Sequence, residues 1–90
     1  MNNKWKVSSE VLSSKIDEEV VLMSIEAGFY FGLETVGSRI WELLSEKPAT
    51  FDELVTLLMD EYEVDEETCR ADVQSFIEDM YSKKLILSAD

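Results

Sequence analysis

FYFGLETVGSRIWELL, residues 29–44, is the stretch in which the hydrophobic pattern of this chain changes its period from two to 3.6. Residues 29–33 carry large side chains on both faces of an extended segment, as strands do when both faces are covered. The residues that follow place their apolar side chains on one face of a helix, which Thr35 is expected to cap: Val36, Ile40, Trp41, Leu43 and Leu44. The stretch therefore predicts a strand that passes directly into a helix, which ends near Glu46 before Pro48.

Two further strands are predicted before this stretch. Residues 11–16 alternate between two faces, and residues 20–25 are rich in β-branched and other apolar residues. The polar residues 17–19 form a turn between them, and Ala27-Gly28 supplies a tight turn before the third strand. The first third of the chain is thus an antiparallel meander. Residues 1–9 are expected to be frayed, with weak strand character at residues 5–7.

The chain after residue 46 is predicted to form two more helices and a short extended end. Thr50 and Glu53 have the spacing of a capping box, and Asp65 is the expected cap of the third helix. Residues 85–87 close the chain as a short strand. Since 90 residues provide for one core, we predict a single domain over residues 1–90. Its class is α+β: a winged-helix-like fold with a three-stranded antiparallel sheet, three helices and a C-terminal strand.

Charge and composition exclude several kinds of partner. The net charge is −12, of which −9 lies from residue 50 onward, so the surface repels nucleic-acid phosphates and anionic lipids. Basic partners are favoured, although solubility alone also explains the charge. The longest run without a charged residue has seven residues, against about 20 needed to span a bilayer, and no secretory signal follows residue 6. We therefore expect a cytoplasmic protein that binds neither membranes nor nucleic acid.

The side chains that catalysis usually needs are missing. The chain has no histidine, its glycines fit no phosphate-binding spacing, and Cys69 is its only cysteine. Cys69 lies on the apolar stripe of the third helix, where a buried structural thiol is the favoured interpretation. The acidic run of residues 60–67 lacks the glycine and the final glutamate of an EF-hand loop. We predict a protein that is not an enzyme and that takes no cofactor and no metal.

The strand at residues 29–33 is predicted to lie at an edge of the sheet, because it is the last strand of the meander. Edges are usually protected by Lys, Pro or a bulge, and none of these is evident in residues 29–33. Either the chain itself covers this edge or a partner does, and the pattern leaves both interpretations open.

Residues 29–44 resemble the signature stretch of the PqqD family, in which an aromatic pair, Gly-Leu, Val-Gly-x-x-Ile-Trp and a pair of leucines recur. The resemblance extends over about residues 10–88. Members of this family are recognition elements for ribosomally made, modified peptides, and free-standing members of this length resemble the leader-binding proteins of lasso-peptide pathways. The resemblance implies a winged-helix-like fold in which a leader peptide adds an antiparallel strand to the third strand, beside the third helix.

The resemblance also implies where a leader would lie. The strand side of the site is Phe29, Tyr30, Phe31, Gly32 and Leu33, whose backbone would pair with the leader. On the third helix, residues at spacings of three and four form one stripe that we assign to the site: Cys69, Val73, Phe76 and Met80. Asp72 and Asp79 flank this stripe and could pair with Lys or Arg of a leader.

The function implied is capture of a precursor leader and its delivery to a processing enzyme, which in lasso pathways is a cysteine-protease-like leader peptidase. Two alternatives stay open. The chain could present a precursor to a radical enzyme in pyrroloquinoline quinone synthesis, or it could be a structural subunit that dimerises through the same strand edge without peptide affinity. The acidic residues 60–67 are one candidate face for docking the enzyme, on the basis of charge alone.

Overall fold

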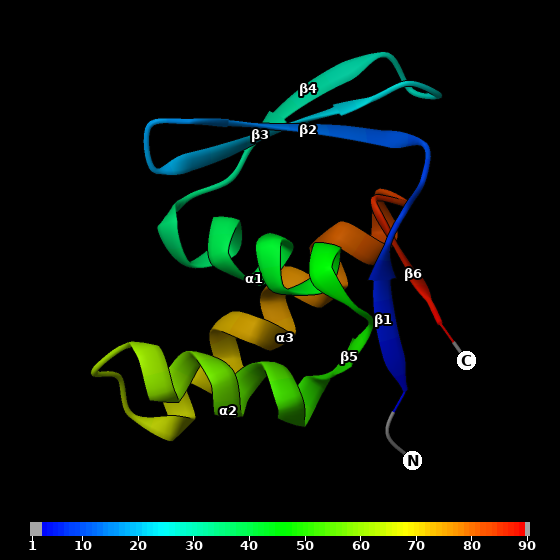
Figure 1. Cartoon of the computed structure of the whole chain (residues 1–90). Helices are drawn as coiled ribbons and strands as arrows, with labels where there is room; N and C mark the ends of the chain where they lie inside the picture. The colour runs from blue at the N-terminus through cyan, green and yellow to red at the C-terminus, as the bar shows by residue number, and fades with distance from the viewer. Residues whose placement is uncertain (1–2, 90) are drawn as a thin grey trace.

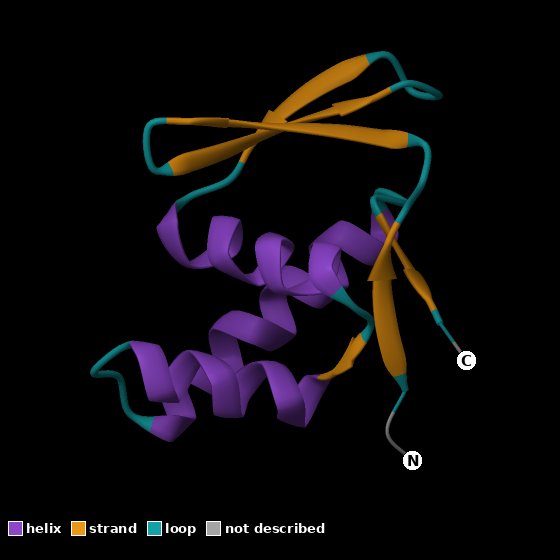
Figure 2. Ribbon diagram, viewed as in Figure 1, coloured by secondary structure: helices purple, strands orange, loops and turns teal. Residues whose placement is uncertain are grey.

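The computed structural model describes residues 3–89, and the meander expected in its first third is present (Figures 1 and 2). Strands β2 (Val11–Ile16), β3 (Glu19–Ser24) and β4 (Phe29–Gly32) form an antiparallel sheet in the order β2-β3-β4. The two turns contain left-handed residues, Asp17 with φ 58° and Gly28 with φ 71°. Because β4 is the last strand in this order, it lies at the edge of the sheet.

Three helices lie below this sheet in Figure 1: α1 (Thr35–Glu46), α2 (Phe51–Glu61) and α3 (Glu66–Ser82). The capping box at the start of α2 is confirmed, since Thr50 Oγ1 accepts from the Glu53 N–H and the Glu53 carboxylate accepts from the Thr50 N–H. The carboxylate of Asp65 caps α3, as predicted.

The cap predicted for the first helix is wrong by one residue. Glu34, not Thr35, has the extended backbone of an N-cap, and its side chain makes no capping bond. Its carbonyl already accepts from the Ser38 N–H at 2.6 Å. Thr35 is therefore inside the first turn of α1, where its hydroxyl cannot serve as the cap.

A second, smaller sheet was not foreseen. Strand β1 (Lys4–Val7) lies between β5 (Ala49–Thr50) and β6 (Ile86–Ser88) and pairs antiparallel with both. The expectation of a frayed stretch is thus wrong for residues 4–7, because both edges of this strand are paired and Trp5 packs edge-on against Tyr81 with ring centroids 5.3 Å apart. Residues 1, 2 and 90 of the domain predicted over residues 1–90 lie outside the described residues.

The α+β architecture predicted from the sequence is confirmed: a three-stranded antiparallel sheet, three helices and a C-terminal strand. Its core draws on every layer. Leu22 of the large sheet, Ile40 and Leu44 of α1, Leu58 of α2 and Ile86 of β6 are all buried in one cluster. This shared core fixes the position of β4 relative to α3.

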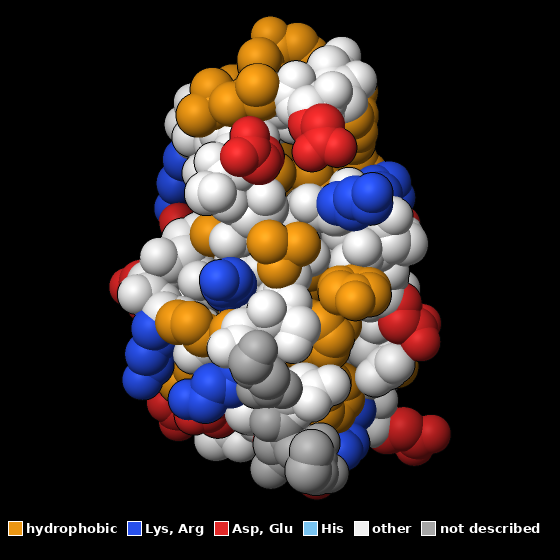
Figure 3. Space-filling view, turned by 90° about the vertical axis from the view of Figure 1, so that its right-hand side faces the viewer, with side chains coloured by type: hydrophobic (Ala, Val, Ile, Leu, Met, Phe, Trp, Pro, Cys, Tyr) orange, Lys and Arg blue, Asp and Glu red, His pale blue; other side chains and the backbone are white. Residues whose placement is uncertain are grey.

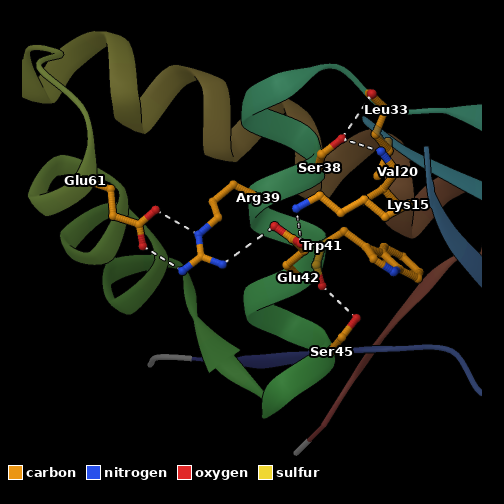
Figure 4. A network of polar contacts seen from close by, with 9 residues as sticks. All are labelled: Lys15, Val20, Leu33, Ser38, Arg39, Trp41, Glu42, Ser45 and Glu61. Carbon is orange, nitrogen blue, oxygen red and sulfur yellow. Dashed lines mark hydrogen bonds and ion pairs between the residues drawn. The ribbon is translucent and has the colours of Figure 1, made fainter. Parts of the chain in front are cut away.

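A chain of ion pairs joins the sheet and two helices on the surface (Figure 4). The Arg39 guanidinium of α1 donates two hydrogen bonds of 2.8 Å to the two carboxylate oxygens of Glu61 on α2. Glu42 of α1 lies 3.6 Å from Arg39 and accepts from Lys15 of β2 at 3.1 Å. The bond from Arg39 is the main cause that holds the pKa of Glu61 below its ordinary value, against an opposing effect of desolvation.

This arrangement predicts a loss of stability in acid. Because the pKa of Glu61 is lower in the folded chain than in the unfolded one, its contribution is complete above the ordinary pKa of an unfolded glutamate and is lost as the pH falls through the folded value. We expect Glu61→Gln to lower the free energy of unfolding at pH 7 by about 0.5–1 kcal/mol and to reduce its fall between pH 5 and pH 3. Urea denaturation at several pH values measures both quantities.

The matched control is Glu63→Gln, an exposed carboxylate two residues away that makes no ion pair within residues 3–89. It should keep the pH dependence of the wild type. The slope that remains in Glu61→Gln is expected to come partly from Glu53 and Asp65, whose capping bonds lower their pKa values. Equal pH dependence in wild type and Glu61→Gln would contradict the prediction.

Candidate functional site

A groove of about 710 Å³ opens between the β4–α1 segment and helix α3. The structure brings together here most of the residues predicted for the site. Phe31, Gly32 and Leu33 line it from the strand side, and Asp72, Phe76, Asp79 and Met80 line it from α3. These two sides are about 40 residues apart in the sequence, and the shared core holds them face to face.

Four predicted residues do not line this groove. Val73 and Cys69 are not among the lining residues, and both are buried in the core, with exposures of 0% and 2%. The Cys69 thiol lies 3.8 Å from the Val55 carbonyl, and burial raises its pKa, which keeps it protonated. Phe29 and Tyr30 lie further along β4, and Tyr30 projects into solvent. The helix therefore contributes only one side of the predicted stripe to the groove.

The outer edge of β4 offers backbone groups to a partner. The Leu33 N–H donates to the Val20 carbonyl at 2.8 Å, so the groups of Leu33, Phe31 and Phe29 point toward β3. By the alternation of an antiparallel ladder, the N–H and C=O groups of Tyr30 and Gly32 point the other way. Within residues 3–89 no strand pairs with this edge. It can accept one more strand, alongside the groove.

Ser38 holds the end of this edge strand in place (Figure 4). Its hydroxyl accepts from the Val20 N–H at 2.9 Å and donates to the Leu33 carbonyl at 3.1 Å, and its side chain is buried. Helix α1 thereby fastens β3 and β4 together where β4 enters the groove. Ser38 was not predicted from the sequence. It borders the apolar face of α1 and has Glu34 and Glu42 four residues away on either side, so no local pattern marks it as buried.

Gly37 also lines the groove, although it was not among the residues predicted for the site. A Cβ atom at this position would lie 3.5 Å from the Phe76 ring, which is ordinary van der Waals contact, so α1 and the ring pack closely here without requiring glycine. Glu34 and Ser75 line the groove as well. Neither was predicted, because only the packing of α3 against α1 shows which side of each helix faces the opening.

The electrostatics of the groove are acidic but uneven. Asp79 forms an ion pair with Lys83, whose ammonium group also lies 4.9 Å from the centroid of the Phe31 ring. Asp72, in contrast, makes no ion pair within the described residues, and it is exposed. Of the two predicted carboxylates, Asp72 is therefore the one free to meet a cation of a ligand.

The groups around the groove indicate which kind of ligand it suits. Among residues 3–89 no group of His, Cys, Asp and Glu side chains is placed to hold a metal ion. None of the helices described is both long enough and apolar enough to cross a membrane. The groove combines an open strand edge, an apolar wall and a free carboxylate, which suits an extended segment with apolar and basic side chains.

Known proteins resemble this chain over most of its length. A family model described as "Coenzyme PQQ synthesis protein D (PqqD)" matches residues 19–86. A structure described as "TbiB1 in Complex with the TbiA(beta) Leader Peptide" is 44% identical with a TM-score of 0.82, over 90% of this chain and 93% of that one. "Lasso peptide synthetase B1 complexed with the leader peptide" shares the fold at 19% identity and a TM-score of 0.79, over 92% and 96%. No curated protein sequence matches the chain.

Ser38→Ala tests the attachment of β4. The substitution leaves the buried Val20 N–H and Leu33 carbonyl without the hydroxyl between them, and we expect a loss of about 1–3 kcal/mol in the free energy of unfolding. The control is Ser45→Ala on the same helix. The Ser45 hydroxyl only adds a second hydrogen bond to the Trp41 carbonyl, so its removal should lower the free energy of unfolding by less than about 0.5 kcal/mol. Urea denaturation measures both. Equal losses in the two variants would show that Ser38 has no special role.

Proposed function

This chain belongs to the PqqD family, and on that premise we propose that it captures the leader segment of a ribosomally made precursor peptide and delivers it to the leader peptidase of a lasso-peptide pathway. The observation that carries the proposal is the open edge of β4 beside the groove. The chain contributes binding, and the chemistry belongs to the enzyme that receives the leader.

The leader would lie along β4 as an added antiparallel strand. The outward N–H and C=O groups of Tyr30 and Gly32 would pair with its backbone, which gives affinity without dependence on leader sequence. Alternate leader side chains would then point toward α3 and enter the groove. The complex of TbiB1 with a leader peptide supports this proposal, because TbiB1 is 44% identical to this chain over nearly its whole length.

The groove would supply the specificity. Its wall contains Leu33, Phe76 and Met80, and each leader side chain buried against them contributes about 1.5–3 kcal/mol. Two or three such side chains, less the cost of ordering the peptide, correspond to a Kd roughly between micromolar and tens of nanomolar. Asp72 would favour leaders with a Lys or Arg near the apolar anchors.

The quinone pathway is the alternative that the family description favours, since it names coenzyme PQQ synthesis. In that role the chain would present a precursor to a radical enzyme. The lasso pathway is favoured by the shared fold of a lasso peptide synthetase B1 in complex with a leader. A macrolactam synthetase and a small protease encoded beside this chain would support the lasso pathway, and a radical enzyme of quinone synthesis would support the alternative.

Tyr30→Pro and Tyr30→Ala separate the backbone of β4 from its side chain. Proline removes the outward N–H but no bond to β3, so the sheet should persist, whereas alanine keeps that N–H. With a labelled leader peptide of the precursor encoded beside this chain, we expect Tyr30→Pro to weaken binding about tenfold or more and Tyr30→Ala less than about threefold. Fluorescence anisotropy measures the affinities and circular dichroism the fold. Similar affinities for the two variants would argue against strand addition.

Asp72→Lys tests the charge of the groove. Replacing this free carboxylate by an ammonium group should weaken a leader that carries Lys or Arg by about three- to tenfold at low salt. The difference should shrink at about 0.5 M NaCl, because salt screens exposed charges. Glu67→Lys makes the same change in charge on the same helix outside the groove, and it is the control. If Glu67→Lys weakens binding equally, only net charge matters and Asp72 has no particular role.

A further inference from the structure

The face of the β2-β3-β4 sheet turned away from the helices is apolar and exposed. In β3 the side chains of Val20, Leu22 and Ser24 are buried, so the alternate ones point outward. The strand register places their cross-strand neighbours on the same side. We call this surface the outer face; it consists of Leu12, Ser14, Ile16, Val21, Met23 and Tyr30, with Ile25 at its end.

Large apolar side chains gather on the outer face instead of lying singly. Leu12, Met23 and Tyr30 are direct cross-strand neighbours in one row. Leu12 is 56% exposed, Ile16 58%, Ile25 53% and Tyr30 75%. The view of Figure 3 shows hydrophobic side chains at the top of the molecule, where Figure 1 places this sheet. A continuous apolar surface of this kind on a small protein usually marks a site of interaction.

The groove does not account for this surface. The groove lies on the side of β4 that faces α3, whereas Tyr30 and Met23 point to the opposite side of the same sheet. A leader strand paired with β4 would occupy the edge between the two. It would extend the sheet, so that one side of the leader becomes continuous with the outer face while the other side fills the groove.

The charges around the outer face indicate the chemistry of its partner. Both turns that border it are acidic, with Asp17, Glu18 and Glu19 at one end and Glu26 at the other. Residues 16–38 contain no Lys or Arg, and Lys15 is turned to the helix side, where it binds Glu42. Two copies of this chain face to face would bring acidic turns together, which disfavours self-association. A surface with an apolar centre and a rim of Lys and Arg fits instead.

We propose that the outer face is the docking surface for the enzyme that receives the leader. This inference rests on the proposed function. The enzyme would contribute an apolar surface bordered by basic residues. It would contact both this chain and the bound leader, which would lie next to each other in one extended sheet. The acidic run of residues 60–67 is the less suitable candidate, because its apolar residues, Tyr62 and Val64, pack against the core.

The test compares two double variants in two assays. Leu12→Ser/Ile16→Ser removes apolar surface from the outer face, and Leu57→Ser/Met59→Ser removes exposed apolar side chains from α2, where they are 38% and 37% exposed. Each is titrated with the labelled leader and, loaded with leader, with the purified leader peptidase encoded beside this chain. We expect the outer-face variant to bind leader within about twofold of wild type and peptidase about tenfold or more weakly. The α2 variant should match the wild type in both assays.

The rim is tested by Glu18→Lys/Glu19→Lys against Glu63→Lys/Glu67→Lys, which reverses the same number of charges in the acidic run. Weaker binding of peptidase by the Glu18→Lys/Glu19→Lys variant alone supports the inference.

Unchanged peptidase binding by the Leu12→Ser/Ile16→Ser variant, or a loss only in the Glu63→Lys/Glu67→Lys variant, overturns the inference while the proposed function stands. A wild-type chain without leader affinity overturns the proposed function and this inference together. A wild-type dimer in sedimentation that Leu12→Ser/Ile16→Ser dissociates would assign the outer face to a second copy.

Discussion

The hydroxyl of Ser38 joins the Val20 N–H to the Leu33 carbonyl, and the rest of the binding surface depends on this one contact. It fastens the end of β4 to α1 from the inner side, where the hydroxyl is shielded from water. Because the strand is held from that side, its other edge can stay open without being lost from the sheet. A strand that receives a peptide has to be held firmly while its outer backbone groups stay unpaired. The Ser38 bridge holds β4 from the inner side and leaves those outer groups open.

The negative charge of the chain is divided among several tasks. Glu53 and Asp65 take part in the N-terminal caps of α2 and α3, and Glu61 of α2 forms an ion pair with Arg39 of α1. These carboxylates stabilise the fold through hydrogen bonds and an ion pair within the chain. Asp72 in the groove makes no such pair in the described residues, nor do the acidic turns around the outer face. Among residues 3–89, unpaired carboxylates thus lie beside the groove and the outer face as well as in the acidic run of residues 60–67, and they favour basic partners over self-association.

A single sheet serves three surfaces in this interpretation. The inner face of β4 packs on the helices and forms the groove, its edge would pair with a leader, and its outer face would meet an enzyme. The period of two in a strand separates these roles, since successive side chains point to opposite faces and the backbone points along the edge. A small chain can therefore hold a peptide and expose it to a second protein without a second domain.

The sequence by itself determined the elements whose signals are local. The strand period before residue 33, the capping box of Thr50 and Glu53 and the edge position of β4 all follow from neighbouring residues. Only the tertiary structure decided which side of α3 faces the groove, because Val73 is buried by packing against other helices and not by its own spacing. The pairing of β1 with β6 and the bridge of Ser38 were likewise decided by contacts between segments far apart in the chain. Such contacts depend on how the layers pack, and no local pattern records them.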